Sequence, residues 1–462
     1  MRTEIVKLVD AYTDACNRYF RDLDTKLDGF PKDYPSIIFE LNAETHPTFC
    51  KAVLNGEAFQ NKLAGGAVWK PLISSAIRDV IKYLILKIIV LVSLFSRRGT
   101  SVKTQLKQAK NFLVTYLDSR SGQLDQKDFN MEAGSIFDQG AWLKMGVRLP
   151  SISWLDYFRS ERAGIVCVER HFKFRYLFGF YVSSYKILLK LKRAGQLSSP
   201  LGIAFLDDFT SGHATFSWQY SHALRHLIER TEKSDLNIAL PMEQQDWMML
   251  SVYHLKKSVG GKIWAIQNGL RPVGNLNLYN FDDAPAYRQS GFDRIYYVPP
   301  TWDSFWKGLG HKSEAIGMPK HRFSNASYAV TIDKQSKRAL YIGGVSVLKF
   351  NQDIELLLAL GEDWEICAKI HPTMPSSPLI DKVTSVSDIA EGEFSFIVYS
   401  NTAMVFQLQA DRERMFFFSY PQELLLNPVC SVDDWHDTTI YMPSADDCVE
   451  NSRYLASKIV ES

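Results

Sequence analysis

The sequence predicts an α/β fold of two Rossmann-like domains, whose parallel sheets face a cleft, preceded by a helical extension. From residue 111 onwards, short apolar runs that end in polar loops alternate with stretches of helical periodicity. This alternation is typical of parallel sheets that are covered by helices on both faces. The chain has 462 residues, 46% of them hydrophobic, which is more than a single core usually holds.

The first series of elements follows residues 1–105, which are expected to form a mainly helical extension. Apolar or β-branched runs predict strands at 112–118, 164–168, 201–206, 237–240 and 262–266. Helical periodicity predicts helices at 178–194, 216–232 and 246–258. Residues 106–285 are therefore expected to form the first Rossmann-like domain.

A second series follows a linker near residues 275–290. Its predicted strands lie at 294–298, 338–342, 365–370, 394–398, 415–418 and 439–442. They place a second Rossmann-like domain at residues 286–445. Ser444 and Asp447 then offer caps for a closing helix at 446–462.

Charge and cysteine content exclude several classes of protein. The 53 basic and 51 acidic residues give a formal net charge of +2, so no global field draws the chain to nucleic acid. The six cysteines are scattered and form no C-x-x-C pair, which favours neither a disulfide framework nor a thiolate zinc site. The amino terminus does not resemble a signal peptide. We expect a cytoplasmic protein.

An apolar run at residues 81–95 leaves three alternatives open. It is interrupted by Lys82 and Lys87 and followed by Arg97 and Arg98. A spanning helix needs about 20 apolar residues, so this run is short for one. A buried or oligomer-facing helix and a membrane-surface helix are the other two interpretations, and the basic flank favours anionic lipid. A membrane-surface helix would make the protein peripheral on the cytoplasmic face of the inner membrane.

Polar residues that directly follow apolar runs are the first candidates for binding, because ligands of parallel sheets bind beyond the carboxyl ends of the strands. One group follows the run at 365–370, and another follows 394–398 and is expected to open a helix at 403–410. The two runs are expected to be neighbouring strands of one sheet. Imidazole, hydroxyl and helix N-terminal N–H groups together would bind a phosphate. These candidates are Lys369, His371, Pro372, Ser400, Asn401 and Thr402. The alternatives are a turn histidine and a plain helix N-cap.

Two further turns follow predicted strands. Gly343, with Gly344, follows 338–342 and would let the backbone approach a ligand, although two glycines also make a plain tight turn. Gln267 and Asn268 follow 262–266 and would place amide groups at the mouth of the cleft. A type I′ turn at Asn268 is the alternative.

Acidic residues of the first domain are candidates for a general base. Four carboxylates lie after apolar runs, and each could instead cap a helix or pair with a cation: Glu243, Asp207, Asp208 and Asp138.

Two other patterns are not interpreted as functional sites. His222 and His226 lack the glutamate and third ligand of a zinc site, which favours a helix-surface pair. The aromatic run at 172–185 has the spacing of a buried helix, so we expect it in the core.

Several short motifs together resemble GT-B glycosyltransferases of bacterial surface-carbohydrate (O-antigen or capsule) biosynthesis, of the Kdo-transferase-like or sialyltransferase-like kind. The segment 241–250, with Glu243, followed by Gln267-Asn268-Gly269 resembles a glutamate segment and its Q-H/N-G turn. Residues 316–319, Ile-Gly-Met-Pro, resemble the G-x-P segment, His371-Pro372 the H-P motif and Ser400-Asn401-Thr402 the serine/threonine motif. The resemblance covers roughly residues 110–445.

The resemblance implies metal-independent transfer of a sugar from a nucleotide donor to a glycan or lipid-linked glycan hydroxyl, without a cofactor. A CMP-sugar, such as CMP-Kdo or CMP-sialic acid, is the donor it favours. The resemblance also implies that the domain at 106–285 binds the acceptor and the domain at 286–445 binds the nucleotide-sugar donor. His371, Ser400 and Thr402 would then stabilise the leaving phosphate. Two positions depart from the pattern: Gln407 stands where a glutamate would bind the donor ribose, and the base motif is reduced to Asp138-Gln139-Gly140.

Two alternatives remain open. A polyol-phosphate transferase would use the same fold and strand-tip histidines, but usually carries a second histidine where this chain has Asn268. A non-catalytic scaffold of a polysaccharide-assembly complex would account for Gln407 and for the lack of an unambiguous base.

Overall fold

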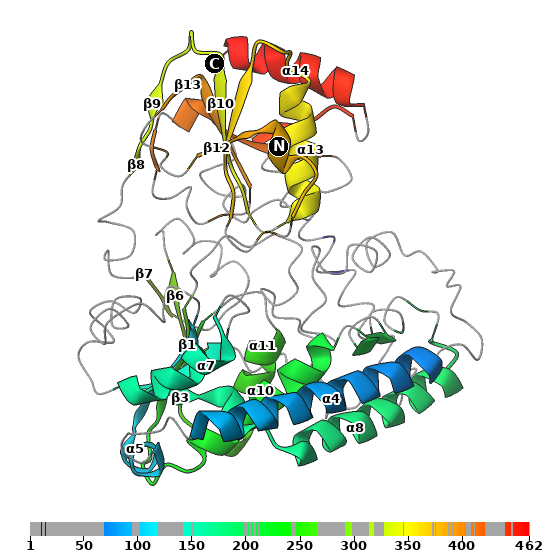
Figure 1. Ribbon diagram of the computed structural model, residues 1–462, viewed down its shortest axis with the longest axis vertical. Coiled ribbons are helices and arrows are strands. Elements are labelled where there is room, and N and C mark those ends of the chain that lie inside the picture. Colours follow the sequence, from blue (N-terminus) through cyan, green and yellow to red (C-terminus); the bar gives the residue numbers. More distant parts are fainter. Residues whose placement is uncertain are drawn as a thin grey trace.

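The computed structural model describes two helix-covered parallel sheets. The described residues are 69–94, 102–117, 142–148, 152–197, 212–241, 246–266, 292–297, 314–317, 328–344, 346–371, 376–386, 392–400, 408–410, 412–420, 439–444 and 447–461, with single residues and pairs outside these ranges. Figure 1 shows the two sheets in separate lobes, the first below and the second above.

The sheet of the first lobe has seven parallel strands in the order β3-β2-β1-β4-β5-β6-β7. Its strands are β1 (Asn111–Leu117), β2 (Trp142–Arg148), β3 (Val166–Cys167), β4 (Asn237–Pro241), β5 (Lys262–Ile266), β6 (Arg294–Tyr297) and β7 (Glu314–Gly317). The order reverses between β1 and β4, where Asn111 pairs with Asn237. This is the doubly wound Rossmann order, and its reversal is the topological switch point.

The sheet of the second lobe has the same order in six parallel strands, β12-β11-β10-β14-β16-β17. They are β10 (Arg338–Ile342), β11 (Glu365–Lys369), β12 (Thr384–Ser385), β14 (Phe396–Tyr399), β16 (Met415–Ser419) and β17 (Thr439–Tyr441). Two short parallel pairs join β8 (Tyr328–Ala329) to β15 (Leu408–Gln409) and β9 (Thr331–Ile332) to β13 (Glu393–Phe394). The switch point of this sheet lies between β10 and β14.

Helices cover both sheets (Figure 1). The first lobe contains α4 (Trp69–Leu94), α5 (Val102–Gln108), α7 (Trp154–Arg159), α8 (Phe174–Arg193), α10 (His213–Ile228) and α11 (Asp246–Ser258). The second contains α13 (Val347–Leu358) and α14 (Cys448–Glu461). Short 3₁₀ turns lie at Ser160–Ala163, Val168–His171, Ile380–Lys382 and Arg412–Arg414.

The central strands form because their residues are apolar on both faces. All four residues of β14 and all five of β16 are buried, and so are the last four of β10. Such runs suit a parallel sheet that helices cover on both sides. The predicted α/β class and the two Rossmann-like sheets are therefore confirmed, whereas the cleft between them stays a prediction.

Several predicted elements differ from the structure. Residues 201–206 were expected to form a strand, but the described ones among them, Gly202, Phe205 and Leu206, are helical. The helix expected at 403–410 is wrong at its end, because Leu408–Gln409 forms β15. Strand β2 was not predicted at all. Its sequence WLKMGVR carries Lys144 and Gly146, which interrupt an apolar run.

The predicted boundary between the domains, at residues 285 and 286, is also wrong. Strands β6 and β7 follow that boundary in sequence, yet they pair with β5 and with each other in the first sheet. The first lobe therefore reaches at least Gly317. Its other end also changes, because α4 and α5 place Leu72, Leu86 and Leu106 in the core and so belong to this lobe as well.

The closing helix is confirmed as α14, with Asp447 as its cap. The Asp447 carboxylate accepts hydrogen bonds from the N–H groups of Val449 and Glu450, both at 2.9 Å. The Ser444 hydroxyl oxygen accepts one from the Asp447 N–H at 3.0 Å. Side-chain acceptors at this position satisfy N–H groups that have no partner within the helix.

Candidate functional site

Three strand ends of the second lobe meet at one edge of its sheet. Strand β10 lies between β11 and β14, and backbone hydrogen bonds tie the loops that follow the three strands. The Gly343 N–H donates to the Lys369 carbonyl at 2.9 Å, and the Ser400 N–H donates to the Ile342 carbonyl at 3.0 Å. The structure therefore brings Gly343, Lys369, His371 and Ser400 together.

The arrangement corrects one detail of the sequence-based expectation. The strands that precede His371 and Ser400 were expected to be neighbours, but β10 separates them. Gly343 follows β10 and so lies between the two motifs. The glycine turn is consequently at the centre of the site, directly at the switch point, where ligands of doubly wound sheets bind.

Gly343 is buried, and atoms of Tyr341, Lys369 and His371 lie close to its backbone. A Cβ atom there would lie 3.2 Å from Cε1 of Tyr341, 3.6 Å from the Lys369 carbonyl oxygen and 3.8 Å from the His371 nitrogen. A larger side chain would press on the loop that carries His371. Glycine at this position lets the loops that follow β10 and β11 approach each other closely.

The amino terminus of α13 follows the same turn. Ser346 is its N-cap, and its hydroxyl oxygen accepts a hydrogen bond from the Lys349 N–H at 3.3 Å. The first turn of α13 carries no acidic residue that would neutralise the positive end of the helix dipole. A helix N-terminus that follows a glycine turn at the end of a strand is a favourable place for a phosphate.

Ser400 and Thr402 are more buried than expected for residues that contact a phosphate, since they are 1% and 8% exposed. The Thr402 N–H donates to the Ser400 carbonyl at 2.7 Å, which makes a tight turn at the end of β14. Burial raises the pKa of Tyr341 well above its usual value, and the Asp353 charge adds to this. Ser400 and Thr402 thus form a turn that is packed into the interior.

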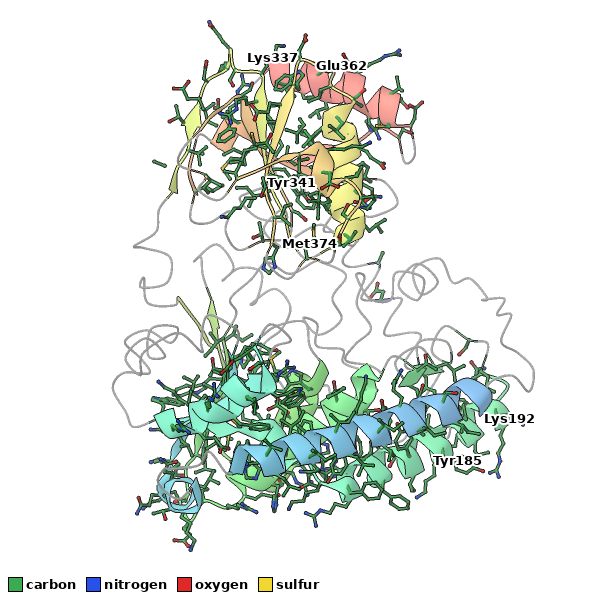
Figure 2. The ribbon with its side chains drawn as sticks, in the orientation of Figure 1. Tyr185, Lys192, Lys337, Tyr341, Glu362 and Met374 are labelled. Carbon is green, nitrogen blue, oxygen red and sulfur yellow. The ribbon has the colours of Figure 1, made fainter. Side chains whose placement is uncertain are left out.

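His371 is half-buried at the same edge. Its carbonyl accepts a hydrogen bond from the Met374 N–H at 2.9 Å, which closes the loop after β11. Figure 2 shows Met374 at the end of the upper lobe that faces away from Lys337 and Glu362. The carboxyl ends of β10 and β11 are thus at this end, and the imidazole has access to a ligand there.

A buried ion pair, missed from the sequence, lies behind the glycine turn. The Lys349 ammonium lies 2.7 Å from the Asp353 carboxylate and donates to the Phe418 carbonyl at 2.6 Å. Tyr420 donates to the same Asp353 oxygen at 3.2 Å, and its ring lies 4.6 Å from the ammonium. The Lys349 ammonium is therefore fully occupied by buried partners, and its bond to Phe418 fixes α13 to β16. A Lys–Asp pair four residues apart usually lies on a helix surface, so no pattern in the sequence indicates that this pair is buried.

The first lobe has its own buried carboxylate near the carboxyl ends of β2 and β3. Glu169 is completely buried and accepts hydrogen bonds from the hydroxyl groups of Tyr157 and Tyr220 and, at 2.7 Å, from the Arg148 N–H. Burial raises the pKa of Glu169, and these hydrogen bonds oppose the rise. Glu169 thus joins β2, α7 and α10 and has no access to a substrate.

The remaining candidate residues lie outside the described part of the chain. They are the four predicted bases and five donor-side positions: Glu243, Asp207, Asp208, Asp138, Gln267, Asn268, Pro372, Asn401 and Gln407. Their roles stay predictions. The structure does fix the strands that precede several of them, since β4 ends at Pro241 and β5 at Ile266.

The histidines of α10 do not form the expected surface pair. His222 stacks on Tyr176 with ring centroids 5.3 Å apart and lies 4.7 Å from His254. Burial, aided by nearby Arg225, lowers the pKa of His222 to about 4. His226 is partly exposed and contacts the Lys173 ammonium at 2.6 Å. Among the described residues no group of three or more histidine, cysteine, aspartate or glutamate side chains could hold a metal ion.

Comparison with known proteins finds similarity to solved structures at the level of the fold. No protein-family model matches the chain, and no curated protein is significantly similar to it. The fold is similar to that of CalG4, the calicheamicin glycosyltransferase, with a TM-score of 0.39 and 8% identity over 77% of this chain and 91% of that one. This likeness is too low to support an argument. The α/β class and the Rossmann order of this chain are instead established by its own strand pairing.

Proposed function

We propose that the chain is a GT-B glycosyltransferase that moves a sugar from a nucleotide-activated donor to a hydroxyl group. The observation that supports this most is the switch point of the second sheet, where the Gly343 turn lies between His371 and Ser400. A second Rossmann-like sheet in the same chain supports a second binding partner, the acceptor.

The phosphate of the donor would bind at the Gly343 turn. The positive end of α13, which has no acidic residue in its first turn, favours negative charge there. The buried Lys349 is already paired with Asp353, so it supplies no free cation to this position. His371 is then the side chain that we assign to the phosphate as its hydrogen-bond donor.

The chemical step would place charge on that phosphate as the bond to the sugar breaks. Fixed donors at the site stabilise this charge in the transition state, so such a transfer needs no metal. A carboxylate from the first lobe would accept the proton of the attacking hydroxyl. Glu243, after β4, is our first candidate, followed by Asp207, Asp208 and Asp138.

The donor and acceptor follow from the motifs of the sequence. The H-P and serine/threonine motifs, at His371 and Ser400, resemble those of Kdo-transferase-like and sialyltransferase-like enzymes. We therefore propose a CMP-sugar as donor and a bacterial O-antigen or capsule glycan, free or lipid-linked, as acceptor.

The test is calorimetric titration of the purified chain with CMP, CDP, UDP and GDP. We expect one of these nucleotides to bind and His371→Ala to weaken its binding at least tenfold, or about 1.4 kcal/mol. His226→Ala, which removes a partly exposed imidazole from α10 in the other lobe, is the matched control and should bind as the wild type does. Absence of binding for all four nucleotides would refute the proposal and favour a scaffold.

A second variant examines the glycine turn directly. Gly343→Val puts a branched side chain within 3.2 Å of the Tyr341 ring and beside the His371 loop. We expect at least a tenfold loss of nucleotide affinity, whereas the same change at Gly179, where a Cβ meets nothing within 4 Å, should leave affinity unchanged. Hydrolysis assays with CMP-, CDP-, UDP- and GDP-sugars then identify the donor.

A further inference from the structure

Helix α4 turns its polar side chains towards the protein. Ser75 and Arg78 donate to the Thr210 carbonyl, at 3.3 and 2.6 Å. Asp79, only 4% exposed, accepts hydrogen bonds from Tyr181 at 2.8 Å and Thr215 at 2.9 Å. These bonds fix the rotation of the helix about its axis, since turning it would leave Asp79 without partners.

The opposite side of α4 is apolar and exposed. Eight large side chains on it are each 50% exposed or more: Ile73, Ile77, Ile81, Leu84, Ile85, Ile88, Leu91 and Val92. A surface helix usually has the reverse arrangement, with its apolar stripe against the core. An apolar face of this length on the outside of a protein indicates a surface that contacts something apolar.

Helix α8 continues this surface. The aromatic run at 172–185 was expected in the core, and this is wrong for one of its sides, because Phe174, Phe178, Val182 and Tyr185 are exposed. They recur at helical spacing along α8. Figures 1 and 2 show α8 alongside α4, and the rings of Tyr83 and Phe174 are 5.8 Å apart. We name these twelve exposed side chains the α4–α8 face.

The exposed charges of these two helices are all positive. Helix α8 has no acidic residue, and the only one of α4 is the buried Asp79. The exposed basic residues of the two helices are Lys82, Arg175, Lys186, Lys190, Lys192 and Arg193. Figure 2 shows Tyr185 and Lys192 near the same end of α8. An apolar surface with a basic border is complementary to a bilayer that contains anionic lipid.

We propose that the α4–α8 face docks the protein on the surface of an anionic lipid bilayer. No helix among the described residues is both long and apolar enough to cross a membrane. Helix α4, with 26 residues, is about 39 Å long and would lie flat, with its isoleucine and leucine side chains below the headgroups. Lys87 does not oppose this, because its ammonium is turned inwards to the Phe172 carbonyl at 2.6 Å.

A second copy of the chain is a poorer occupant of the same face. A two-fold dimer places the same patch of each copy against the other. The basic residues of α8 would then approach their equivalents, with no acidic residue of either helix to pair with them. Lipid phosphates supply that missing negative charge. The inference does not depend on glycosyl transfer, since it rests on α4 and α8 alone.

Vesicle sedimentation tests the proposal with the full chain. We expect the wild type to bind phosphatidylcholine vesicles that contain phosphatidylglycerol, and to bind pure phosphatidylcholine more weakly. The double variant Ile77→Glu/Ile88→Glu should lose at least tenfold in vesicle affinity, because two apolar contacts become buried charges. Lys186→Glu/Lys190→Glu should reduce binding to the anionic vesicles alone.

The matched control is Val449→Glu on α14, which changes a side chain of comparable exposure, 57%, in the other lobe. It should bind vesicles as the wild type does. Circular dichroism checks that each variant is folded, and nucleotide titration checks the second lobe separately. The proposal is overturned if the wild type ignores anionic vesicles, or if Ile77→Glu/Ile88→Glu binds them unchanged. It is also overturned if that variant only turns a dimer into a monomer.

Discussion

The two lobes share a strand order but hold their buried polar groups in different ways. In the second lobe, Lys349 and Asp353 form an ion pair beneath α13. In the first, Glu169 is surrounded by neutral hydroxyl groups and a backbone N–H. The same topology therefore tolerates two quite different environments for a fully buried carboxylate. The lobes should consequently respond differently to the loss of one polar group and to acid.

The largest effect is expected at Asp353. Asp353→Ala leaves the Lys349 ammonium buried without its carboxylate, which typically costs about 3–5 kcal/mol of unfolding free energy. Urea denaturation monitored by hydrogen exchange of individual peptides should show the loss of stability in the second lobe, with peptides of the first lobe unaffected. A variant that loses less than about 1 kcal/mol would contradict the importance of the pair.

Removing both charges provides the control for this prediction. Lys349→Met/Asp353→Leu replaces the pair by apolar side chains of similar size, and such exchanges are often nearly neutral in stability. We expect the double variant to be more stable than Asp353→Ala. Equal destabilisation of the two would mean that packing, and not the unpaired charge, dominates at this position.

A smaller effect is expected at Glu169. Glu169→Gln keeps the shape of the side chain but removes one acceptor from the tyrosine hydroxyls, and should cost about 1–3 kcal/mol in the first lobe. Tyr157→Phe provides a comparison, because it removes a hydroxyl group that contacts both Glu169 and, at 2.6 Å, the Gly146 carbonyl. If Glu169→Gln proves as damaging as Asp353→Ala, the two interiors do not differ in the way inferred here.

The smallest effect concerns pH. Burial, with nearby positive charges, lowers the pKa of His171 and His254 to about 3 and that of His222 to about 4. Below about pH 6.5 the unfolded chain binds protons that the folded first lobe does not, so stability falls as the pH falls towards these values. Between pH 7 and 5.5 each histidine contributes about 1 kcal/mol to the loss.

Replacing one histidine isolates this contribution. His254→Leu should reduce the drop in unfolding free energy between pH 7 and 5.5 by about 1 kcal/mol. The second lobe has one histidine among its described residues, the half-buried His371, and should be less sensitive over the same range. Equal sensitivity of both lobes to acid would show that other groups govern the pH dependence.

The sequence predicted the central strands well for a physical reason. Strands β5 and β10 and helix α11 begin and end at the predicted residues. The two strands are apolar runs bounded by charged or glycine residues, which is the pattern of a fully covered parallel strand. In residues 201–206 the run is equally apolar, but a run that short does not distinguish a strand from a buried helix.

Membership of a sheet was harder to predict than the strands themselves. Strand β6 was found near its true position, at 294–298, but was assigned to the wrong domain. Repeated strand–helix units look alike in sequence, and nothing local records which sheet a strand joins. The direction in which α4 faces was left open for a related reason: its apolar residues were visible in the sequence, but the direction they face depends on Asp79 and its distant partners.

The candidate site was predictable to the extent that it depends on strand ends. His371, Ser400 and Gly343 were found because residues after parallel strands share one edge. The burial of Ser400 and the ion pair behind the turn could not be predicted, since both depend on packing between elements that are distant in sequence.

The strand order also has a consequence for the way in which the chain folds. Each switch point needs contact between distant segments: Asn111 with Asn237 in the first sheet, and Ala339 with Phe396 in the second. The first of these loops is roughly twice as long, so its closure costs about 0.6 kcal/mol more in chain entropy. The second lobe thus closes its switch point over the shorter loop and should complete its sheet sooner, so the half that carries His371 is expected to refold first.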